Sequence, residues 1–315
     1  MVIITGGAGF IGSCLLGKIT DKYDIIVVDT LGIDKKWKNI RDKRMRDLWS
    51  PEEFRQKMRT GIPECEAIIH LGACTSTYEQ NMELLLDENY RYSKEIFNFC
   101  ATNNVKFIYA SSAAMYNSSL NEASTEKAKM WARNQYAFSK QLFDHWVATQ
   151  RTEFQCVGLR FFNVYGPNEY HKGDMVSVIN KFYHEIKMNN TVKIYKSYKP
   201  GIANGEAMRD FVYVFDVVSV ILFFLEHSNI SGIFNVGTGA ANSYNKIAEL
   251  VFHELKKEKN ICYVDMPDAI KNGYQYYTKA SIMKLREVGY TRRFMSIEEG
   301  VHDYVCSYLM PNQYY

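Results

Sequence analysis

The stretch VIITGGAGFIG, residues 2–12, is the part of the sequence that decides the fold class. It begins with an apolar run of strand character, and Gly6, Gly9 and Gly12 follow in the pattern G-x-x-G-x-x-G as a helical pattern opens. Glycines at such a junction allow a tight strand-to-helix turn and the close approach of a pyrophosphate, which the free N–H groups and the dipole of the helix favour. Asp29 ends the next apolar run, where a carboxylate usually binds the ribose hydroxyls of a dinucleotide. These residues predict a dinucleotide-binding βαβ unit.

Apolar runs and helical patterns alternate through the first half of the chain. The nearly continuous apolar character of the runs is typical of strands that are covered on both faces of a parallel sheet. We expect strands at Val2–Thr5, Ile25–Asp29, Ala67–Leu71, Phe107–Ala110 and Cys156–Arg160, and helices at Ile11–Ile19, Glu52–Thr60, Glu79–Thr102 and Tyr136–Arg151. This alternation predicts an α/β protein with a doubly wound parallel Rossmann sheet.

After Gly166-Pro167 the sequence changes to a mixture of charges, tyrosines and loop residues. We expect a nucleotide-binding Rossmann domain over residues 1–167 and a smaller, mostly C-terminal α/β substrate domain over residues 168–315. The apolar segment Phe211–Leu225 and the strand-like GIFNVGTG, residues 232–239, indicate that the chain returns to the first domain near residues 209–238.

Composition places the chain among ordinary globular proteins. Of its 315 residues, 47% are apolar and 23% charged, which excludes collagen-like, low-complexity and largely disordered classes. A net charge of +3 gives no reason to expect a nucleic-acid partner, and no apolar stretch is long enough to cross a membrane. Seven scattered cysteines without a C-x-x-C pair indicate free thiols in a reducing compartment. We therefore expect a cytoplasmic protein without disulfides or a metal site.

The choice between NAD and NADP stays open at this point. Asp29 alone favours NAD, because its charge repels a 2′-phosphate. The basic run that follows could neutralise that phosphate, or could simply be a solvated face. This run contains Lys35, Lys36, Lys38 and Arg41.

Tyr136 and Lys140 form the pattern Y-x-x-x-K at the start of a helical segment. The spacing places both side chains on one face of the helix, a turn apart. A nearby ammonium and the cationic nicotinamide ring both favour the phenolate, so we expect Lys140 and a bound nicotinamide together to bring the pKa of Tyr136 into a working range for a base. Ser112 ends the predicted strand upstream, at the carboxyl edge where doubly wound sheets bind ligands, and could hydrogen-bond the reacting oxygen.

Together these motifs resemble the extended short-chain dehydrogenase/reductase family of sugar-nucleotide enzymes. The resemblance covers essentially the whole chain, and its motifs are TGGAGFIG (5–12), HLGA (70–73), DENYRYSKE (87–95), YASSAAMY (109–116), YAFSK (136–140), LRFFNVYGP (159–167) and RDFVYVFD (209–216). Within the family, Cys74–Thr77 and the segment His171-Lys172-Gly173 are most similar to the ADP-L-glycero-D-manno-heptose 6-epimerases.

The resemblance implies an NADP-dependent isomerase that acts on ADP-heptose in the synthesis of lipopolysaccharide core precursors, as a homo-oligomer and often a pentamer. It implies catalytic roles for Tyr136 and Lys172, supported by Lys140 and Ser112. The implied cofactor contacts are Gly6, Gly9, Phe10, Ile11, Gly12, Asp29, Thr30, Lys36, Leu71, Gly72, Ala73, Cys74, Thr75, Asn89, Lys140, Val164 and Lys172. The implied substrate contacts are Ser112, Asn163, Asp174, Lys181, Tyr195, Arg209 and Tyr274.

Inversion of an unactivated carbinol carbon cannot begin with direct deprotonation, because its C–H bond is too weakly acidic. The route left is transient oxidation and return of the same hydride to the other face. A single base serves two substrate orientations poorly, so we expect Tyr136 to serve one and Lys172 the other. The alternatives are a phosphate contact or a surface lysine for Lys172, and an ion pair with Asp210 or Asp216 for Arg209.

Some residues depart from the family pattern. Asp174 stands where serine is usual and Lys181 where histidine is usual, and the segments Asn117–Arg133 and Lys199–Glu206 also differ. Another nucleotide-sugar epimerase, such as a 4-epimerase, therefore stays an alternative. A 4,6-dehydratase is disfavoured, since Ala113-Ala114 replace its acidic pair after the catalytic Ser/Thr. A non-catalytic NADP-binding regulator is disfavoured because Tyr136 and Lys140 are both present.

Overall fold

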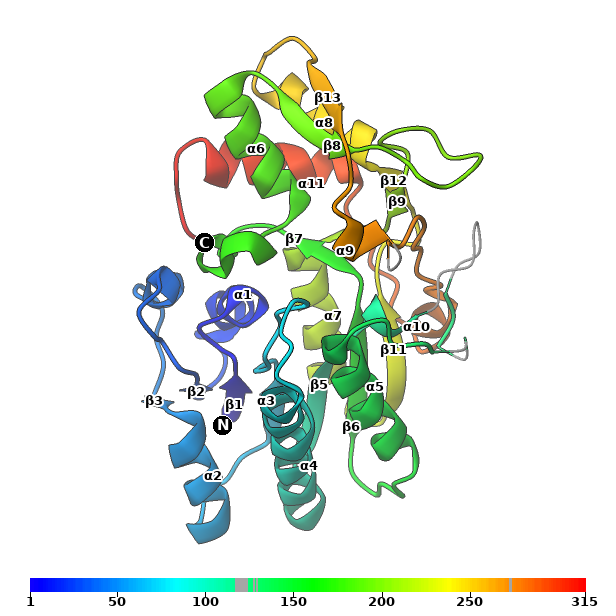
Figure 1. Cartoon of the computed structure of the whole chain (residues 1–315). Helices are drawn as coiled ribbons and strands as arrows, with labels where there is room; N and C mark the ends of the chain where they lie inside the picture. The colour runs from blue at the N-terminus through cyan, green and yellow to red at the C-terminus, as the bar shows by residue number, and fades with distance from the viewer. Residues whose placement is uncertain (117–123, 127, 129, 272–273) are drawn as a thin grey trace.

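A computed structural model of the chain describes residues 1–116, 124–126, 128, 130–271 and 274–315. Within those residues the largest sheet has seven strands in the order β11-β6-β5-β4-β1-β2-β3, and all its neighbours are parallel. The strands are β1 (Val2–Thr5), β2 (Ile25–Val28), β3 (Asp47–Trp49), β4 (Ala67–His70), β5 (Lys106–Ser112), β6 (Cys156–Phe161) and β11 (Gly232–Val236). The predicted doubly wound Rossmann sheet is confirmed (Figure 1).

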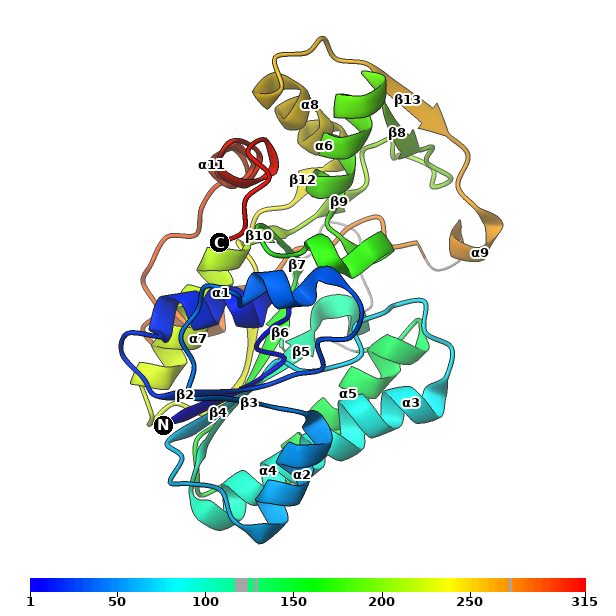
Figure 2. The ribbon, with the colours of Figure 1, turned by 90° about the vertical axis from the view of Figure 1, so that its left-hand side faces the viewer.

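Both faces of this sheet are buried, which explains why its strands are apolar throughout. Alternate residues of β1 point to opposite sides: Val2 and Ile4 join one buried cluster and Ile3 joins another. Helices α1 (Phe10–Ile19) and α7 (Val214–Glu226) cover the first face. The second face is covered by α2 (Pro51–Thr60), α4 (Tyr92–Asn103) and α5 (Gln135–Ala148) (Figure 2).

Two details differ from the sequence-based prediction. Strand β3 was not predicted, because its three residues lie at the sheet edge and two of them are exposed. The single helix predicted at Glu79–Thr102 is divided into α3 (Met82–Leu86), a π turn at Asp87–Arg91 and α4. The π turn contains the buried Asn89, and such turns are frequent at functional sites.

A second lobe lies beyond the carboxyl ends of the strands. Its core is formed by α6 (Val178–Asn189), α8 (Tyr244–Glu254), α11 (Ile297–Asp303) and the parallel pair β8 (Val192–Tyr195) and β13 (Ile261–Val264). Shorter elements connect the lobe to the sheet: β7 (Asn163–Tyr165), β9 (Met208–Arg209), β10 (Phe211–Tyr213), β12 (Asn242–Ser243), α9 (Asp268–Lys271) and α10 (Met283–Glu287).

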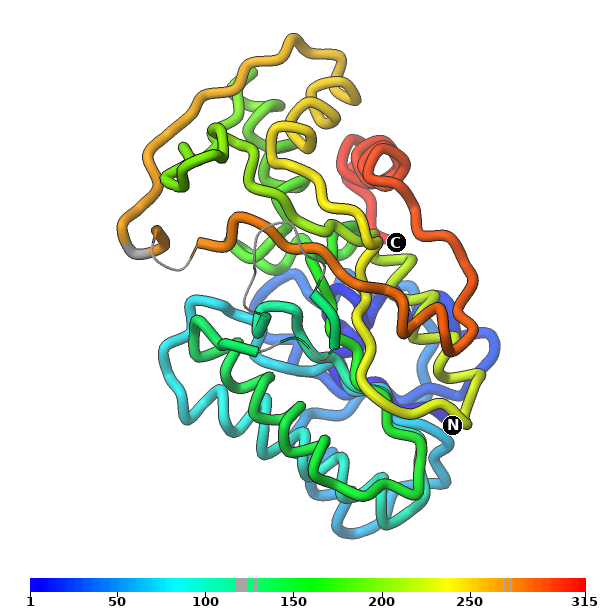
Figure 3. Tube along the Cα trace, turned by 90° about the vertical axis from the view of Figure 1, so that its right-hand side faces the viewer, coloured from blue at the N-terminus to red at the C-terminus, as the bar shows by residue number. Residues whose placement is uncertain are grey.

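The chain passes between the two parts more than once. Strand β11 lies beside β6 in the central sheet, α8 belongs to the second lobe, and Leu285 and Tyr290 pack again on the sheet before α11 completes the lobe (Figure 3). Because the strands are parallel and the second lobe lies beyond their carboxyl ends, the loops that follow β1, β4, β5 and β6 all face this lobe. No helix in the described ranges is long and apolar enough to span a membrane.

Candidate active site

A cavity of about 1350 Å³ lies between the carboxyl edge of the sheet and the second lobe. Ser112, Tyr136, Lys140 and Lys172 all line it, so the four predicted catalytic residues share one site. The predicted cofactor residues that also line it are Gly6, Gly9, Phe10, Ile11, Gly12, Asp29, Lys36, Leu71, Gly72, Ala73, Cys74, Thr75 and Val164. The predicted substrate residues that line it are Asn163, Asp174, Lys181, Tyr195, Arg209 and Tyr274.

The glycine loop is built for close backbone packing. Gly6 has a φ of +68°, and a Cβ there would lie 2.6 Å from the backbone nitrogen of Gly72. A Cβ on Gly12 would lie 2.1 Å from the carbonyl oxygen of Gly6. Gly9 caps α1 without a side chain, so the first N–H groups of the helix face the cavity without a side-chain acceptor. This arrangement fits the pyrophosphate of a dinucleotide.

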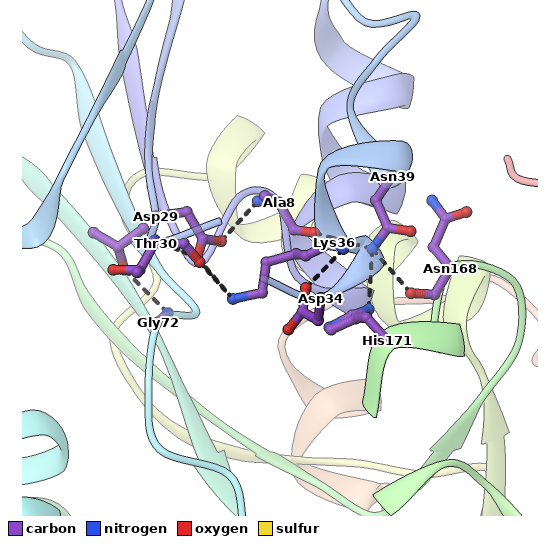
Figure 4. Close-up of polar contacts among 10 residues, drawn as sticks. Ala8, Asp29, Thr30, Asp34, Lys36, Asn39, Gly72, Asn168 and His171 are labelled. Carbon is purple, nitrogen blue, oxygen red and sulfur yellow. Dashed lines mark hydrogen bonds and ion pairs between the residues drawn. The ribbon is translucent and has the colours of Figure 1, made fainter. Parts of the chain in front are cut away.

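Asp29 holds this loop and is itself neutralised by a lysine (Figure 4). Its carboxylate accepts hydrogen bonds from the backbone N–H of Ala8 at 2.9 Å and of Thr30 at 2.8 Å. Lys36 donates a hydrogen bond to the same carboxylate at 3.0 Å. Of the four residues in the predicted basic run, all of them described by the structure, Lys36 is the one that lines the cavity. This part of the cavity thus combines an acid with a cation.

Asn39 connects the glycine loop with the segment that carries Lys172. Its amide nitrogen donates at 3.0 Å to the carbonyl oxygens of both Ala8 and Asn168, and it lies 3.2 Å from Nδ1 of His171 (Figure 4). Burial lowers the pKa of His171, and the charge of Lys36 adds to this shift. Asp34 opposes the shift, and Lys172 also adds to it.

Tyr136 and Ser112 form the centre of the site. Asn134 starts α5 by accepting a hydrogen bond from the N–H of Ala137 at 2.8 Å, which places Tyr136 in the first turn of the helix. Ser112 hydrogen-bonds the Tyr136 hydroxyl, an interaction that lowers the pKa of Tyr136, but burial raises that pKa by more.

Without the nicotinamide ring that the prediction includes, the pKa of Tyr136 lies above its ordinary value. Lys140 is deeply buried, and burial lowers its own pKa to about 8, against the opposing effect of Asp144. A lysine with a pKa of about 8 is still mostly protonated at neutral pH, so Lys140 keeps most of its positive charge in the site.

Lys172 lies on a 3₁₀ turn at Tyr170–Met175, with its Nζ 5.5 Å from the ring centroid of Phe10. Burial lowers the pKa of Lys172, and the carboxylate of Glu169 opposes that shift. Glu169 is buried and accepts hydrogen bonds from the hydroxyls of Ser177 at 2.6 Å and Tyr304 at 2.9 Å. Lys172 is thus held at the cavity by a fixed turn, which argues against an ordinary surface lysine.

A buried ion pair behind the site was not predicted from the sequence. Asp144 lies one turn after Lys140 and accepts hydrogen bonds from Arg160 Nε at 2.8 Å, Ser111 Oγ at 2.9 Å and Tyr109 at 3.2 Å. It therefore holds α5 against β5 and β6, the strands that end beside Ser112. Arg160 lies in the LRFFNVYGP motif, but no motif contains Asp144, and the pattern gives no sign that the two residues pair.

Arg209 presents its guanidinium between two tyrosine rings, 5.8 Å from the centroid of Tyr244 and 5.4 Å from that of Tyr274. The carboxylate of Asp210 accepts hydrogen bonds from the Thr238 and Gly239 backbones instead. Asp216 likewise accepts from the backbone N–H of Met295. The carboxylates that could have paired with Arg209 are thus engaged elsewhere, and its charge faces the cavity.

Two predicted cofactor residues do not line the cavity. Thr30 contacts Asp29 and Lys36 through its backbone. Asn89 is buried, and its side-chain amide makes hydrogen bonds of 2.9 Å with the backbone N–H and carbonyl oxygen of Cys74. It also donates to Ser139 Oγ at 3.0 Å, so it joins the loop after β4 to α5. The deviating segment 199–206 does not line the cavity either. Residues 117–123, 127 and 129 of the other deviating segment are outside the described residues.

Several cavity residues carried no sequence signal. Tyr244, Lys193 and Gln275 come from stretches without a motif, and only the fold brings them to the site. His171 was part of the recognised segment, but its contact with Asn39 could not be foreseen.

Comparisons with known proteins agree with this geometry. The NAD dependent epimerase/dehydratase family model matches residues 2–237. An ADP-L-glycero-D-manno-heptose-6-epimerase of Fusobacterium nucleatum is 42% identical over all of both chains. One of Nitratidesulfovibrio vulgaris (strain Hildenborough) is 40% identical over 98% of both. The crystal structure of the Helicobacter pylori ADP-L-glycero-D-manno-heptose-6-epimerase, 27% identical, covers 96% of this chain and 94% of its own with a TM-score of 0.82. The chain belongs to the NAD-dependent epimerase/dehydratase family and, within it, to the ADP-L-glycero-D-manno-heptose-6-epimerases.

Proposed function

We propose that this isomerase converts ADP-D-glycero-D-manno-heptose to ADP-L-glycero-D-manno-heptose by inverting C6, with NADP as its cofactor. The observation that carries the proposal is that Tyr136 and Lys172, from two separate elements, line the same cavity as the glycine loop and Arg209. The names of the relatives supply the substrate.

The chemistry that a nicotinamide dinucleotide supplies when bound is reversible hydride transfer, which lets C6 pass through a ketone and be reduced on its other face. The protein manages the proton of the C6 oxygen. Tyr136 handles that proton in one sugar orientation, with Ser112 as its hydrogen-bond partner, and Lys172 handles it in the other.

Arg209 would hold the diphosphate of the substrate, because its guanidinium lies near two tyrosine rings and is fixed by a hydrogen bond from Nη1 to the carbonyl oxygen of Met208. Asn163, Lys181 and Tyr195 would contact the rest of the molecule. Asp174 also lines the cavity and is exposed, so it can turn toward solvent, away from the phosphates.

NADP is supported by Lys36. Its ammonium balances the charge of Asp29, so a 2′-phosphate would meet a cation as well as the acid. We expect Lys36→Ala to weaken NADP binding at least about tenfold relative to NAD, since a hydrogen bond to a charged group contributes about 1.5–3 kcal/mol. Titration of both cofactors by protein fluorescence measures this ratio, and an unchanged ratio would exclude Lys36 as the 2′-phosphate contact.

The function is tested by incubating the protein with ADP-D-glycero-D-manno-heptose and reading the configuration at C6 by NMR, with UDP-galactose as a control for 4-epimerase activity. We expect inversion of the heptose without net production of reduced nicotinamide. In heavy water the inverted carbon should carry no deuterium, because the hydride returns internally. Deuterium at C6 would refute the hydride mechanism, and exclusive turnover of UDP-galactose would refute the substrate.

The remaining expectations about the cell are part of the same proposal. A role in lipopolysaccharide core precursor synthesis, a cytoplasmic location and a homo-oligomer would follow from membership of this group of enzymes. Light scattering of the purified protein would measure the assembly.

A further inference from the structure

The second lobe holds a cluster of three side chains with metal-binding atoms, away from the active site. Glu254 ends α8, His302 lies on α11, and Cys306 follows one turn later in the π turn at Tyr304–Leu309. The helices α8 and α11 pack against each other (Figure 2), so ligands from both meet at one point.

The distances in this cluster match a small tetrahedral ion. Oε2 of Glu254 lies 2.8 Å from Nδ1 of His302 and 3.3 Å from Sγ of Cys306, and the last two atoms are 3.8 Å apart. Bonds of about 2.0–2.3 Å at tetrahedral angles require ligand atoms about 3.3–3.6 Å from one another. Each observed distance is within about 0.5 Å of that range, and His302 is exposed enough to adjust.

The donor set points to zinc rather than to a hard cation. Thiolate, imidazole and carboxylate are the three ligand types that Zn²⁺ takes in proteins, whereas Ca²⁺ and Mg²⁺ bind oxygen ligands. The ion pairs of Glu254 in the described chain are with His302 and His253, and its side chain is only 13% exposed. A largely buried carboxylate without a lysine or arginine partner is a place where a bound cation would be stabilising.

We propose that Glu254, His302 and Cys306 form a structural Zn²⁺ site that joins α8 to α11. The thiol of Cys306 loses its proton to solvent as its sulfur binds the metal, and the fourth position, which faces solvent, is filled by water. The site is structural because α8 separates it from the cavity: Tyr244 lines the cavity at the first residue of this helix, and Glu254 ends it about 15 Å away along its axis. Zinc there would stabilise the second lobe without entering the reaction.

The test measures Zn²⁺ binding to chelator-treated full-length protein by competition with a chromogenic chelator. We expect one Zn²⁺ per chain and an increase in the midpoint of thermal unfolding when the metal is added. His302→Ala and Cys306→Ser should each weaken Zn²⁺ binding at least about tenfold. Loss of a residue that only supports a metal's ligands already lowers metal affinity by about that factor, and these two residues would be ligands themselves. Cys262→Ser is the matched control, because Cys262 is an exposed thiol elsewhere in the lobe, and it should bind zinc like the wild type.

Cobalt gives a second readout that a hydrogen-bonded cluster would not produce. Co²⁺ bound at the site should show a thiolate-to-metal charge-transfer absorption that Cys306→Ser abolishes and Cys262→Ser keeps. Serine preserves a hydrogen bond to Glu254, so the comparison separates coordination from simple hydrogen bonding. Absence of stoichiometric Zn²⁺ binding, or wild-type affinity in both ligand variants, would overturn the proposal.

Discussion

The ion pair between Asp144 and Arg160 allows a quantitative prediction about the support of the active site. The side chains are 1% and 3% exposed, and the pair joins α5, which carries Tyr136 and Lys140, to the central sheet. Arg160→Met keeps most of the apolar volume but leaves the Asp144 carboxylate without its cation. Breaking a buried pair from one side usually costs about 3–5 kcal/mol.

The structure places the expected loss at the lower end of that range. In the variant, Asp144 keeps its hydrogen bonds from Tyr109 and Ser111, and these reduce the cost of leaving its carboxylate without a cation. The loss of the Arg160 bonds to the Tyr116 hydroxyl and the Glu126 carbonyl oxygen adds to the cost. We expect the free energy of unfolding to fall by about 3 kcal/mol. At about 2–4 °C per kcal/mol this is a decrease of about 6–12 °C in the unfolding midpoint.

The assay is urea unfolding followed by circular dichroism, with the double variant Asp144→Asn/Arg160→Met as the control. The double variant removes both charges, so it should be no less stable than Arg160→Met alone. A loss below about 1 kcal/mol in Arg160→Met would refute the role of the pair, as would a double variant whose loss equals the sum of the two single losses.

Three further predictions follow from the site and the core. Tyr136→Phe and Lys172→Met should each lower kcat for epimerisation by about 10²–10⁴-fold without changing the affinity for the cofactor. Unchanged turnover in either variant would exclude that residue from proton transfer. Gly12→Ala should abolish cofactor binding, measured by fluorescence titration, because its Cβ would lie 2.1 Å from the Gly6 carbonyl oxygen, and wild-type affinity would contradict the packing argument. Burial lowers the pKa of His70 from 6.5 to about 3, so as the pH falls the unfolded chain takes up the proton before the folded chain does. The ratio of folded to unfolded protein should therefore fall by up to about tenfold per pH unit between about pH 6.5 and about pH 3. His70→Asn should flatten this dependence in acid unfolding curves.

The features that could be predicted from the sequence are those that depend on local pattern. The apolar runs at β1, β2, β4 and β6 locate the central strands to within a residue, because a strand buried on both faces must be apolar throughout. The glycine loop is also recognised locally, since Gly12 meets the carbonyl oxygen of Gly6 within the same turn, although Gly6 also packs against the distant Gly72.

What could not be predicted depends on contacts between distant segments. Tyr244 reaches Arg209 because β12 pairs with β9, and Asn39 meets His171 across more than a hundred residues. The pKa of Tyr136 shows the same limit: the spacing to Lys140 indicates an interaction, but burial, which no spacing reveals, decides its direction.

Burial shifts the pKa values of the two proposed proton carriers, Tyr136 and Lys172, in opposite directions. It disfavours charge on both, so it raises the pKa of Tyr136 and lowers that of Lys172. A neutral phenol can donate a proton, and a lysine whose pKa is lowered becomes an acceptor more readily once it has lost its own proton. Inversion at an alcohol carbon needs both, because oxidation releases the hydroxyl proton and reduction of the ketone consumes one. Similar burial of two different residues can therefore supply the acid and the base of one redox-neutral reaction.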